Sequence, residues 1–105
     1  MCGIAGYFRF DGRAASKLVL DRMGSAIGHR GPDGEACWQH GPIGLTHRRL
    51  AIIDLTALAA QPMSSADGRF VITFNGEIYN FRELRKELQL LGCVFSTNSD
   101  TEVLL

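Results

Sequence analysis

The order of short apolar segments constrains the fold of this chain more than any other feature of its sequence. Such segments, separated by turns rich in glycine and proline, are typical of strands. The strands predicted on this basis are residues 2–8, 36–39, 43–54, 70–75 and 77–80. The segment 43–54 is either one long strand or a strand with a bend, and the last two strands are hinged at Gly76. An apolar face at helical spacing predicts a helix over 15–28, followed by a loop over 29–35. Strands and helices in this order favour a mixed sheet with helices packed on it, which is an α+β fold.

Two helix starts are marked in the second half of the chain. Asn80 and Glu83 have the spacing of a capping box and precede a stripe of apolar residues at helical spacing. Ser99 and Glu102 predict a second capping box, which begins a helix at Asp100. Because this second helix has barely one turn before the sequence stops, the chain is expected to be a fragment of a longer protein.

Composition argues against several classes of partner. The chain has 105 residues, the size of one small domain, and 46% of them are hydrophobic, which is enough for a core. Its 11 basic and 11 acidic residues balance, which argues against nucleic-acid or membrane partners attracted by net charge. The apolar runs are too short to span a bilayer. Three cysteines without a CxxC pair argue against a disulfide framework and favour a reducing, cytoplasmic setting.

Cys2 is the first candidate for chemistry. Because cysteine is small, we expect the initiator residue Met1 to be removed, which leaves a thiol and a free α-amino group on Cys2. This amine titrates close to cellular pH, so it can serve as the general base for the thiol without a histidine. From position alone, a buried structural cysteine is the alternative.

Further candidates lie near strand ends and at a helix start. Asn75 and Gly76 can present two N–H groups as an oxyanion hole, although Asn-Gly is also a strong hairpin-turn signal. Arg48 and Arg49 point to opposite faces of their strand, so that one can bind a carboxylate in a cleft. A surface salt bridge is the alternative. Asp100 suits the first turn of a helix and can equally bind a substrate ammonium group.

The sequence carries no motif for a metal or a nucleotide. The three histidines, His29, His40 and His47, match no ligand spacing and are interpreted as turn or strand residues. No glycine-rich phosphate-binding motif occurs. Cys37 and Cys93 lie in apolar segments and are interpreted as core residues. Neither kind of site is therefore predicted.

Taken together, the motifs resemble one family. MCGIAGYF, HRGPDG, HRRLAIIDL, QPM, FNGEIYNF and SDTEVLL, in this order, are similar to the N-terminal glutaminase domain of glutamine-hydrolysing asparagine synthetases. These are class II glutamine amidotransferases of the N-terminal nucleophile (Ntn) hydrolase superfamily. The resemblance implies an αββα sandwich that is incomplete here, with residues 1–105 as the N-terminal part of the domain and the synthetase domain absent. Apolar faces left uncovered in such a sandwich would favour self-association.

The resemblance also implies roles for individual residues. The implied catalytic residues are Cys2 as the nucleophile, and Asn75 and Gly76 as the oxyanion hole. The implied substrate-binding residues are Arg49 for the α-carboxylate of L-glutamine, Leu50 and Ile52 along the site, and Glu77 and Asp100 near the amino end. The loop over 30–34 would lie close by, without an assigned role.

The implied reaction is the hydrolysis of glutamine to glutamate. The thiolate attacks the side-chain carbonyl, ammonia leaves, and water hydrolyses the resulting thioester. This half needs no metal or organic cofactor, since ATP and magnesium would belong to the absent synthetase domain, which amidates aspartate with the ammonia. Other interpretations are the amidotransferase part of a related enzyme of the β-lactam synthetase type, a non-catalytic fragment or interaction module, and a papain-like Cys–His enzyme.

Overall fold

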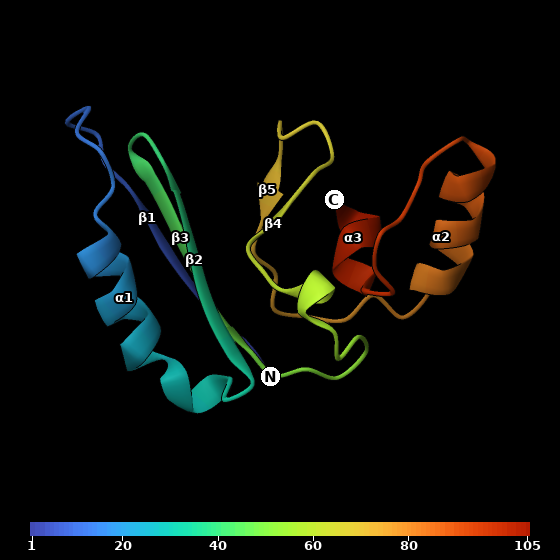
Figure 1. Cartoon of the computed structure of the whole chain (residues 1–105), viewed down its shortest axis with the longest axis horizontal. Coiled ribbons are helices and arrows are strands. Elements are labelled where there is room, and N and C mark those ends of the chain that lie inside the picture. The colour runs from blue at the N-terminus through green and yellow to red at the C-terminus, as the bar shows by residue number, and fades with distance from the viewer.

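Two antiparallel sheets and three helices form the fold, and the computed structural model describes residues 1–105 (Figure 1). The helices are α1 (Lys17–Ala26), α2 (Phe81–Leu90) and α3 (Asp100–Leu104). The strands are β1 (Gly3–Phe8), β2 (Gly34–His40), β3 (Ile43–Arg49), β4 (Met63–Ser64) and β5 (Val71–Ile72). The 3-10 turns are η1 (Gly28–Arg30) and η2 (Ala57–Ala59). This mixture of helices and strands agrees with the predicted α+β class.

β3 is the central strand of the larger sheet, whose order is β1–β3–β2. Both neighbours pair with it in antiparallel fashion, so that Arg48 lies opposite Gly3 on one side and Glu35 on the other. Helix α1 covers one face of this sheet (Figure 1), and the side chain of Leu20 is fully buried. A Cβ added at Gly44 would lie 2.9 Å from the Leu20 side chain, so the missing side chain at this position allows the helix to pack closely.

The two arginines at the end of β3 point to opposite faces, as strand alternation predicted. Arg48 turns toward α1, where its Nε donates to the carbonyl of Gly24 at 2.9 Å and its guanidinium pairs with Glu35 at 2.8 Å. Arg49 turns instead toward the loop that follows the strand. Arg48 therefore ties the sheet to α1, and Arg49 is left for the opposite face.

The strand expected over 43–54 ends at Arg49, so the prediction for its last residues was wrong. The Arg49 guanidinium donates to the carbonyl groups of Asp54 and Thr56, which requires the chain to fold back toward the strand. The carboxylate of Asp54 also accepts from the backbone N–H of Thr56 at 2.8 Å, which closes a local turn. These side-chain contacts favour a loop where the apolar pattern alone predicted a strand.

The second sheet is smaller than predicted. Its strands β4 and β5 pair in antiparallel fashion, and β5 is shorter than the strand expected over 70–75. The segment 77–80 is not a strand. The backbone N–H of Ile78 donates to the carboxylate of Asp100, and its carbonyl accepts from Phe81, where α2 begins. No further strand therefore lies between β5 and α2.

The other predicted elements lie close to their expected positions. β1 and β2 contain most of the strands predicted over 2–8 and 36–39, and α1 lies within the helix predicted over 15–28. The loop predicted over 29–35 is interrupted at its ends, by η1 and by the first residues of β2.

The two predicted capping boxes form only in part. The hydroxyl of Ser99 accepts from the backbone N–H of Thr101 at 3.1 Å and caps α3, as predicted. Glu102 does not complete this box, because its carboxylate accepts from two backbone N–H groups that precede the helix. Helix α2 begins where predicted, but the side chain of Asn80 makes no capping hydrogen bond, so that box was wrong.

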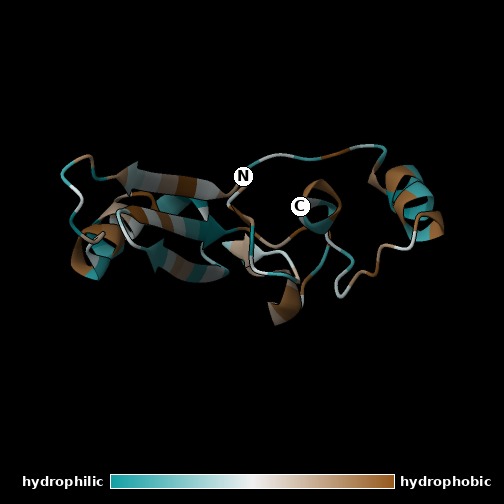
Figure 2. Ribbon diagram, turned by 90° about the horizontal axis from the view of Figure 1, so that it is seen from above, coloured by the Kyte–Doolittle hydropathy of each residue, from teal (hydrophilic) through white to brown (hydrophobic).

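Buried side chains form a small apolar group and a larger polar one. The buried hydrophobic residues are Ala15, Leu20, Ala59 and Met63. The buried polar residues are Thr46, His47, Asp54, Gln61, Thr97, Ser99, Asp100 and Thr101. Helix α2 buries no residue and stands at one end of the molecule, with apolar and polar sides (Figure 2). None of the helices has the length and apolar character needed to cross a membrane.

Candidate active site

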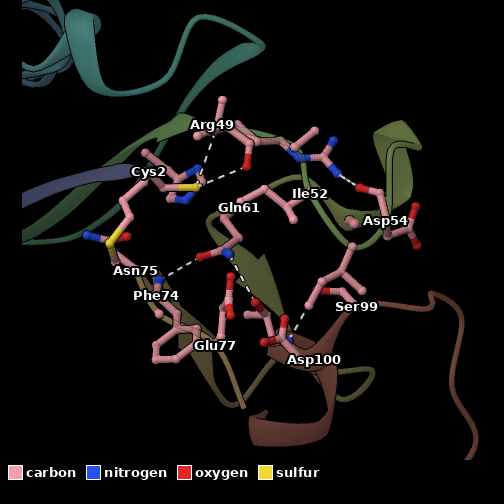
Figure 3. A pocket seen from close by; sticks show the side chains of 18 residues that line it. Cys2, Arg49, Ile52, Asp54, Gln61, Phe74, Asn75, Glu77, Ser99 and Asp100 are labelled. Atoms are coloured by element: carbon pink, nitrogen blue, oxygen red, sulfur yellow. Dashed lines mark hydrogen bonds between the residues drawn. The ribbon is translucent and has the colours of Figure 1, made fainter. Parts of the chain in front are cut away.

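A cavity lies where the end of β3 meets later parts of the chain (Figure 3). Five segments of the chain line it, within the ranges 1–2, 47–54, 59–61, 74–77 and 99–101. They include every residue that the resemblance assigned to catalysis or substrate binding, namely Cys2, Arg49, Leu50, Ile52, Asn75, Gly76, Glu77 and Asp100. The fold therefore brings these eight residues together, while their individual roles stay predictions.

The thiol of Cys2 lies against the backbone of Leu50. Its Sγ accepts from the Leu50 N–H at 3.2 Å and donates to the Leu50 carbonyl at 3.5 Å (Figure 3). The carbonyl of Cys2 accepts from Arg30 Nε at 3.2 Å. Gly3, next to Cys2, pairs with Arg48, and Gly34 pairs with Arg49, next to Leu50. Because strand pairing fixes these neighbours of both residues, the sulfur has a defined position on the cavity wall.

The loop that follows η1 is attached to the same part of β3. A Cβ added at Gly31 would lie 2.4 Å from the carbonyl carbon of Arg48, so only glycine allows this close backbone approach. The N–H of Asp33 donates to the carbonyl of Arg49 at 2.9 Å, and its carboxylate accepts from the N–H of Ala51 at 2.9 Å. These contacts flank Leu50 on both sides. The loop thus holds the backbone against which the Cys2 thiol lies.

Arg49 reaches the cavity from β3 but is partly engaged by its own chain. Its Nη1 donates to the carbonyl of Thr56 at 2.7 Å, and its Nη2 donates to the carbonyl of Asp54 (Figure 3). A guanidinium has five N–H groups, so further ones remain for a ligand. Arg49 is therefore a cation with a fixed orientation at the wall of the cavity.

Asn75 and Gly76 follow β5 and do not form a tight hairpin, because no strand follows them. Just before them, the N–H of Phe74 donates to Oε1 of Gln61 at 2.5 Å. A Cβ added at Gly76 would lie 2.7 Å from the ring of Phe74, so the ring packs against the glycine. The hairpin interpretation of this dipeptide was wrong, and both of its residues line the cavity.

Two acidic residues complete the opposite wall. Asp100 is 6% exposed, and its Oδ2 accepts from the N–H of Ile78 at 2.9 Å. Glu77, next to Ile78, is exposed at the mouth of the cavity. The cavity thus has a cation on one wall and carboxylates on the other, an arrangement that suits a zwitterion.

Sequence reasoning missed Asp54 and Gln61 as site residues. The hydroxyl of Thr56, and then the backbone N–H groups of Asn98 and Thr56, hold the pKa of the Asp54 carboxyl below its ordinary value through hydrogen bonds. Gln61 bridges Phe74 and Thr101, since its Nε2 donates to Thr101 Oγ1 at 3.1 Å. The spacing of Asp54 and Thr56 is a signal for a local turn, but it does not reveal the distant partner.

His47 is a buried histidine on the cavity wall. It is 1% exposed, lies in β3 as a strand residue, and its Nε2 has no hydrogen-bond partner. Burial lowers the pKa of the imidazole, the positive charge of Arg49 lowers it further, and the backbone of Phe74 opposes the change. The two hydrogen bonds of the Cys2 thiol go to Leu50, which gives no support to a Cys–His pair.

No group of three or more histidine, cysteine or acidic side chains is arranged to hold a metal ion. The other cysteines are separate from the cavity. Cys37 donates to Asp21 at 3.6 Å under α1, and Cys93 is exposed, so its interpretation as a core residue was wrong. The residues with ionisable groups at the cavity are thus Cys2, His47, Arg49, the acidic residues, and Met1, which carries the α-amino group of the chain.

The chain is similar to known proteins over its whole length. The family described as a glutamine amidotransferase domain matches residues 1–105. Asparagine synthetase [glutamine-hydrolyzing] 1 of Bacillus subtilis (strain 168) is 44% identical over 108 residues, covering 100% of this chain and 17% of that relative. Asparagine synthetase [glutamine-hydrolyzing] of Sandersonia aurantiaca is 42% identical over 105 residues, covering 99% of this chain and 19% of that relative.

The chain thus spans less than a fifth of the length of these two relatives. The match to the family, in contrast, extends over every residue of the chain and includes all segments that line the cavity. The chain therefore belongs to the glutamine amidotransferase domain family.

Proposed function

We propose that this chain is the glutaminase part of a glutamine-hydrolysing asparagine synthetase. The observation that carries the proposal is one cavity in which a thiol, a guanidinium, an Asn-Gly pair and the carboxylates of Glu77 and Asp100 meet. The names of the relatives support glutamine as the substrate. Their greater length supports a further synthetase domain that receives the ammonia, with aspartate as the acceptor.

In the proposed mechanism, removal of Met1 frees the α-amine of Cys2. The amine accepts the thiol proton, and the thiolate attacks the side-chain carbonyl carbon of glutamine. The oxygen becomes an oxyanion, for which Asn75 and Gly76 supply the N–H donors. The C–N bond then breaks, and the departing nitrogen takes the proton from the α-ammonium and leaves as ammonia. Water hydrolyses the thioester to glutamate and regenerates the thiol.

Substrate recognition in this proposal uses the opposite charges of the two walls. Arg49 binds the α-carboxylate with the N–H groups that the loop does not use, while Asp100 and Glu77 face the α-ammonium group. Leu50 and Ile52 lie along the substrate between these groups and Cys2. The backbone N–H of Leu50, which now donates to the sulfur, keeps the nucleophile at one position during attack.

The finer fold and the surroundings of the domain belong to the same proposal. We expect the two sheets to be part of an αββα sandwich of the Ntn hydrolase type, in the cytoplasm, with self-association through uncovered apolar faces. The glutaminase half needs no cofactor, since the residues of the cavity supply the nucleophile, the base and the oxyanion donors. ATP and magnesium would act only in the synthetase domain.

The first test is the intact mass of the full-length gene product after incubation with an electrophilic glutamine analogue. We expect one adduct, mapped to Cys2, on a chain that has lost Met1. Cys2→Ala should abolish both the adduct and glutamine-dependent ammonia release, whereas the exposed control Cys93→Ala should preserve them. Equal ammonia release from wild type and Cys2→Ala would refute the assignment of the nucleophile.

A further inference from the structure

The carboxylate of Asp54 joins two walls of the cavity that are far apart in the sequence. Its Oδ1 accepts from the N–H of Thr56 at 2.8 Å and from the Thr56 hydroxyl at 2.6 Å. Its Oδ2 accepts from the N–H of Asn98 at 2.9 Å. Asp54 is 8% exposed, so these bonds are shielded from water. The side chain therefore connects the loop after β3 to the segment that leads into α3.

On the first wall, the turn that Asp54 closes is also the support for Arg49. The carbonyl groups of Asp54 and Thr56 both accept from the Arg49 guanidinium, one from each terminal nitrogen. If the turn opened, both acceptors would move away from the guanidinium. The orientation of Arg49 therefore depends on the carboxylate of Asp54.

On the second wall, the bond from Asn98 fixes the start of α3. Ser99 follows directly and caps the helix, and Asp100 is the first helical residue. The carboxylate of Asp100 in turn accepts from the N–H of Ile78, beside Glu77. The segment that Asp54 holds through Asn98 thus carries the acidic wall of the cavity.

We propose that Asp54 is the positioning residue that sets the separation of Arg49 and Asp100, and thereby selects a free α-amino acid as substrate. The inference rests on the proposed function, which assigns these two residues to the α-carboxylate and the α-ammonium group of glutamine. A substrate must offer both charges at one fixed separation to meet both walls. Glutamine within a peptide lacks these charges and is rejected.

Asp54→Asn is the informative substitution because it keeps the shape of the side chain. Both carboxylate oxygens accept from backbone N–H groups, so either orientation of the amide places an N–H against another N–H. We expect the KM for glutamine to rise about tenfold or more, as for the loss of a hydrogen bond to a charged group, with kcat preserved. The reaction of Cys2 with iodoacetamide, which offers neither charge, should keep its wild-type rate.

Two control variants separate this role from a general effect of changing a polar residue. Asp67 accepts from the Ser65 hydroxyl and from the N–H of Arg69, but only within one exposed turn, so Asp67→Asn should leave KM unchanged. Asn98 uses its backbone N–H, so Asn98→Ala keeps the bond and should also leave KM unchanged.

The measurement is glutamine hydrolysis by the full-length protein, with Cys2 alkylation followed by mass mapping. An unchanged KM in Asp54→Asn would overturn the proposal. So would a loss of iodoacetamide reactivity as large as the loss of kcat/KM, because Asp54 would then act on the whole site. If wild type itself hydrolyses no glutamine, the proposed function fails first. In that case, amide hydrogen exchange at Thr56 and Asn98 tests the positioning role by itself. Equal protection of these two amides in wild type and Asp54→Asn would overturn that role.

Discussion

At the scale of single residues, the cavity depends on polar side chains whose partners lie far away in the sequence. Asp54 and Asn98 are 44 positions apart, and Gln61 and Thr101 are 40 positions apart. Each bond removes a buried polar group from water and supplies it with a partner, so the loss of one partner is costly. His47 is different, because its buried Nε2 has no partner. We therefore expect the stability of the folded state to depend on pH through His47.

We predict that the folded state loses stability as pH falls below about 6.5, the ordinary pKa of histidine. Burial lowers the pKa of His47 in the folded state, so the unfolded chain binds the proton at a higher pH than the folded chain does. Protonation therefore favours unfolding in this window. Urea unfolding at neutral and at mildly acidic pH measures the effect.

His47→Gln should reduce this pH dependence, whereas the exposed control His40→Gln should not. If both variants keep the full pH dependence of the wild type, the assignment to His47 is wrong.

The carboxyl group of Asp54 affects the stability of the folded state in a lower pH range. Its pKa lies below the ordinary 3.8, so its contribution is present above that pH and is lost as pH falls through the lower, folded-state pKa.

At the scale of elements, the end of β3 is held by the loop that follows η1. Gly31 approaches the backbone of β3 closely, and Asp33 bonds on both sides of Leu50. The HRGPDG segment, which the resemblance left without an assigned role, thus supports the wall that contacts the thiol. Its glycines are not equivalent, because a Cβ at Gly34 would meet Arg49 at an ordinary distance of 3.5 Å.

We predict that Gly31→Ala costs about 1–3 kcal/mol of stability and sharply lowers glutaminase activity, because the new methyl group would overlap the β3 backbone. Gly34→Ala is the matched control and should change both quantities little. Thermal unfolding and ammonia release measure the two effects. A Gly31→Ala variant as stable and active as Gly34→Ala would show that the loop can shift without cost.

The sequence predicted helices and strands well where the pattern that marks them is local. β1, α1 and the start of α3 follow from alternation, helical spacing and the cap of Ser99. The end of β3 could not be predicted, because Arg49 draws the following loop back through tertiary contacts. Most candidate site residues were suggested by the residues themselves, whereas Leu50, Ile52 and Glu77 came only from the family resemblance. Asp54 and Gln61 were missed because their roles depend on distant partners.

At the scale of the whole molecule, stabilising contacts are unevenly distributed among the helices and strands. β3 is bonded on both edges and covered by α1, whereas α2 buries no residue. Contacts of α2 with the chain around residue 97 include the bond from Arg85 Nη1 to the Thr97 carbonyl at 2.6 Å and the Arg85 guanidinium over the Phe95 ring at 4.9 Å. The side chains of Phe81, Leu84 and Leu88 on its apolar side are only half-buried, so this helix is held by few contacts.

We predict that backbone amides of β3 exchange slowest with solvent and those of α2 fastest among the regular elements. Arg85→Ala should speed exchange in α2 without changing the KM for glutamine, while the exposed control Arg82→Ala should change neither. Amide hydrogen exchange followed by mass spectrometry measures this order. Exchange in α2 as slow as in β3 would show that the helix is held by contacts beyond those of Arg85.

The loop between Arg49 and Thr56 is held by the carboxylates of Asp33 and Asp54 rather than by buried apolar side chains. Apolar exposure is what raises the heat capacity on unfolding, and polar exposure lowers it. Local opening of this loop should therefore have a small heat-capacity change, unlike opening of the sheet beneath α1. The cavity wall would then keep nearly the same relative stability in the cold, where apolar cores weaken.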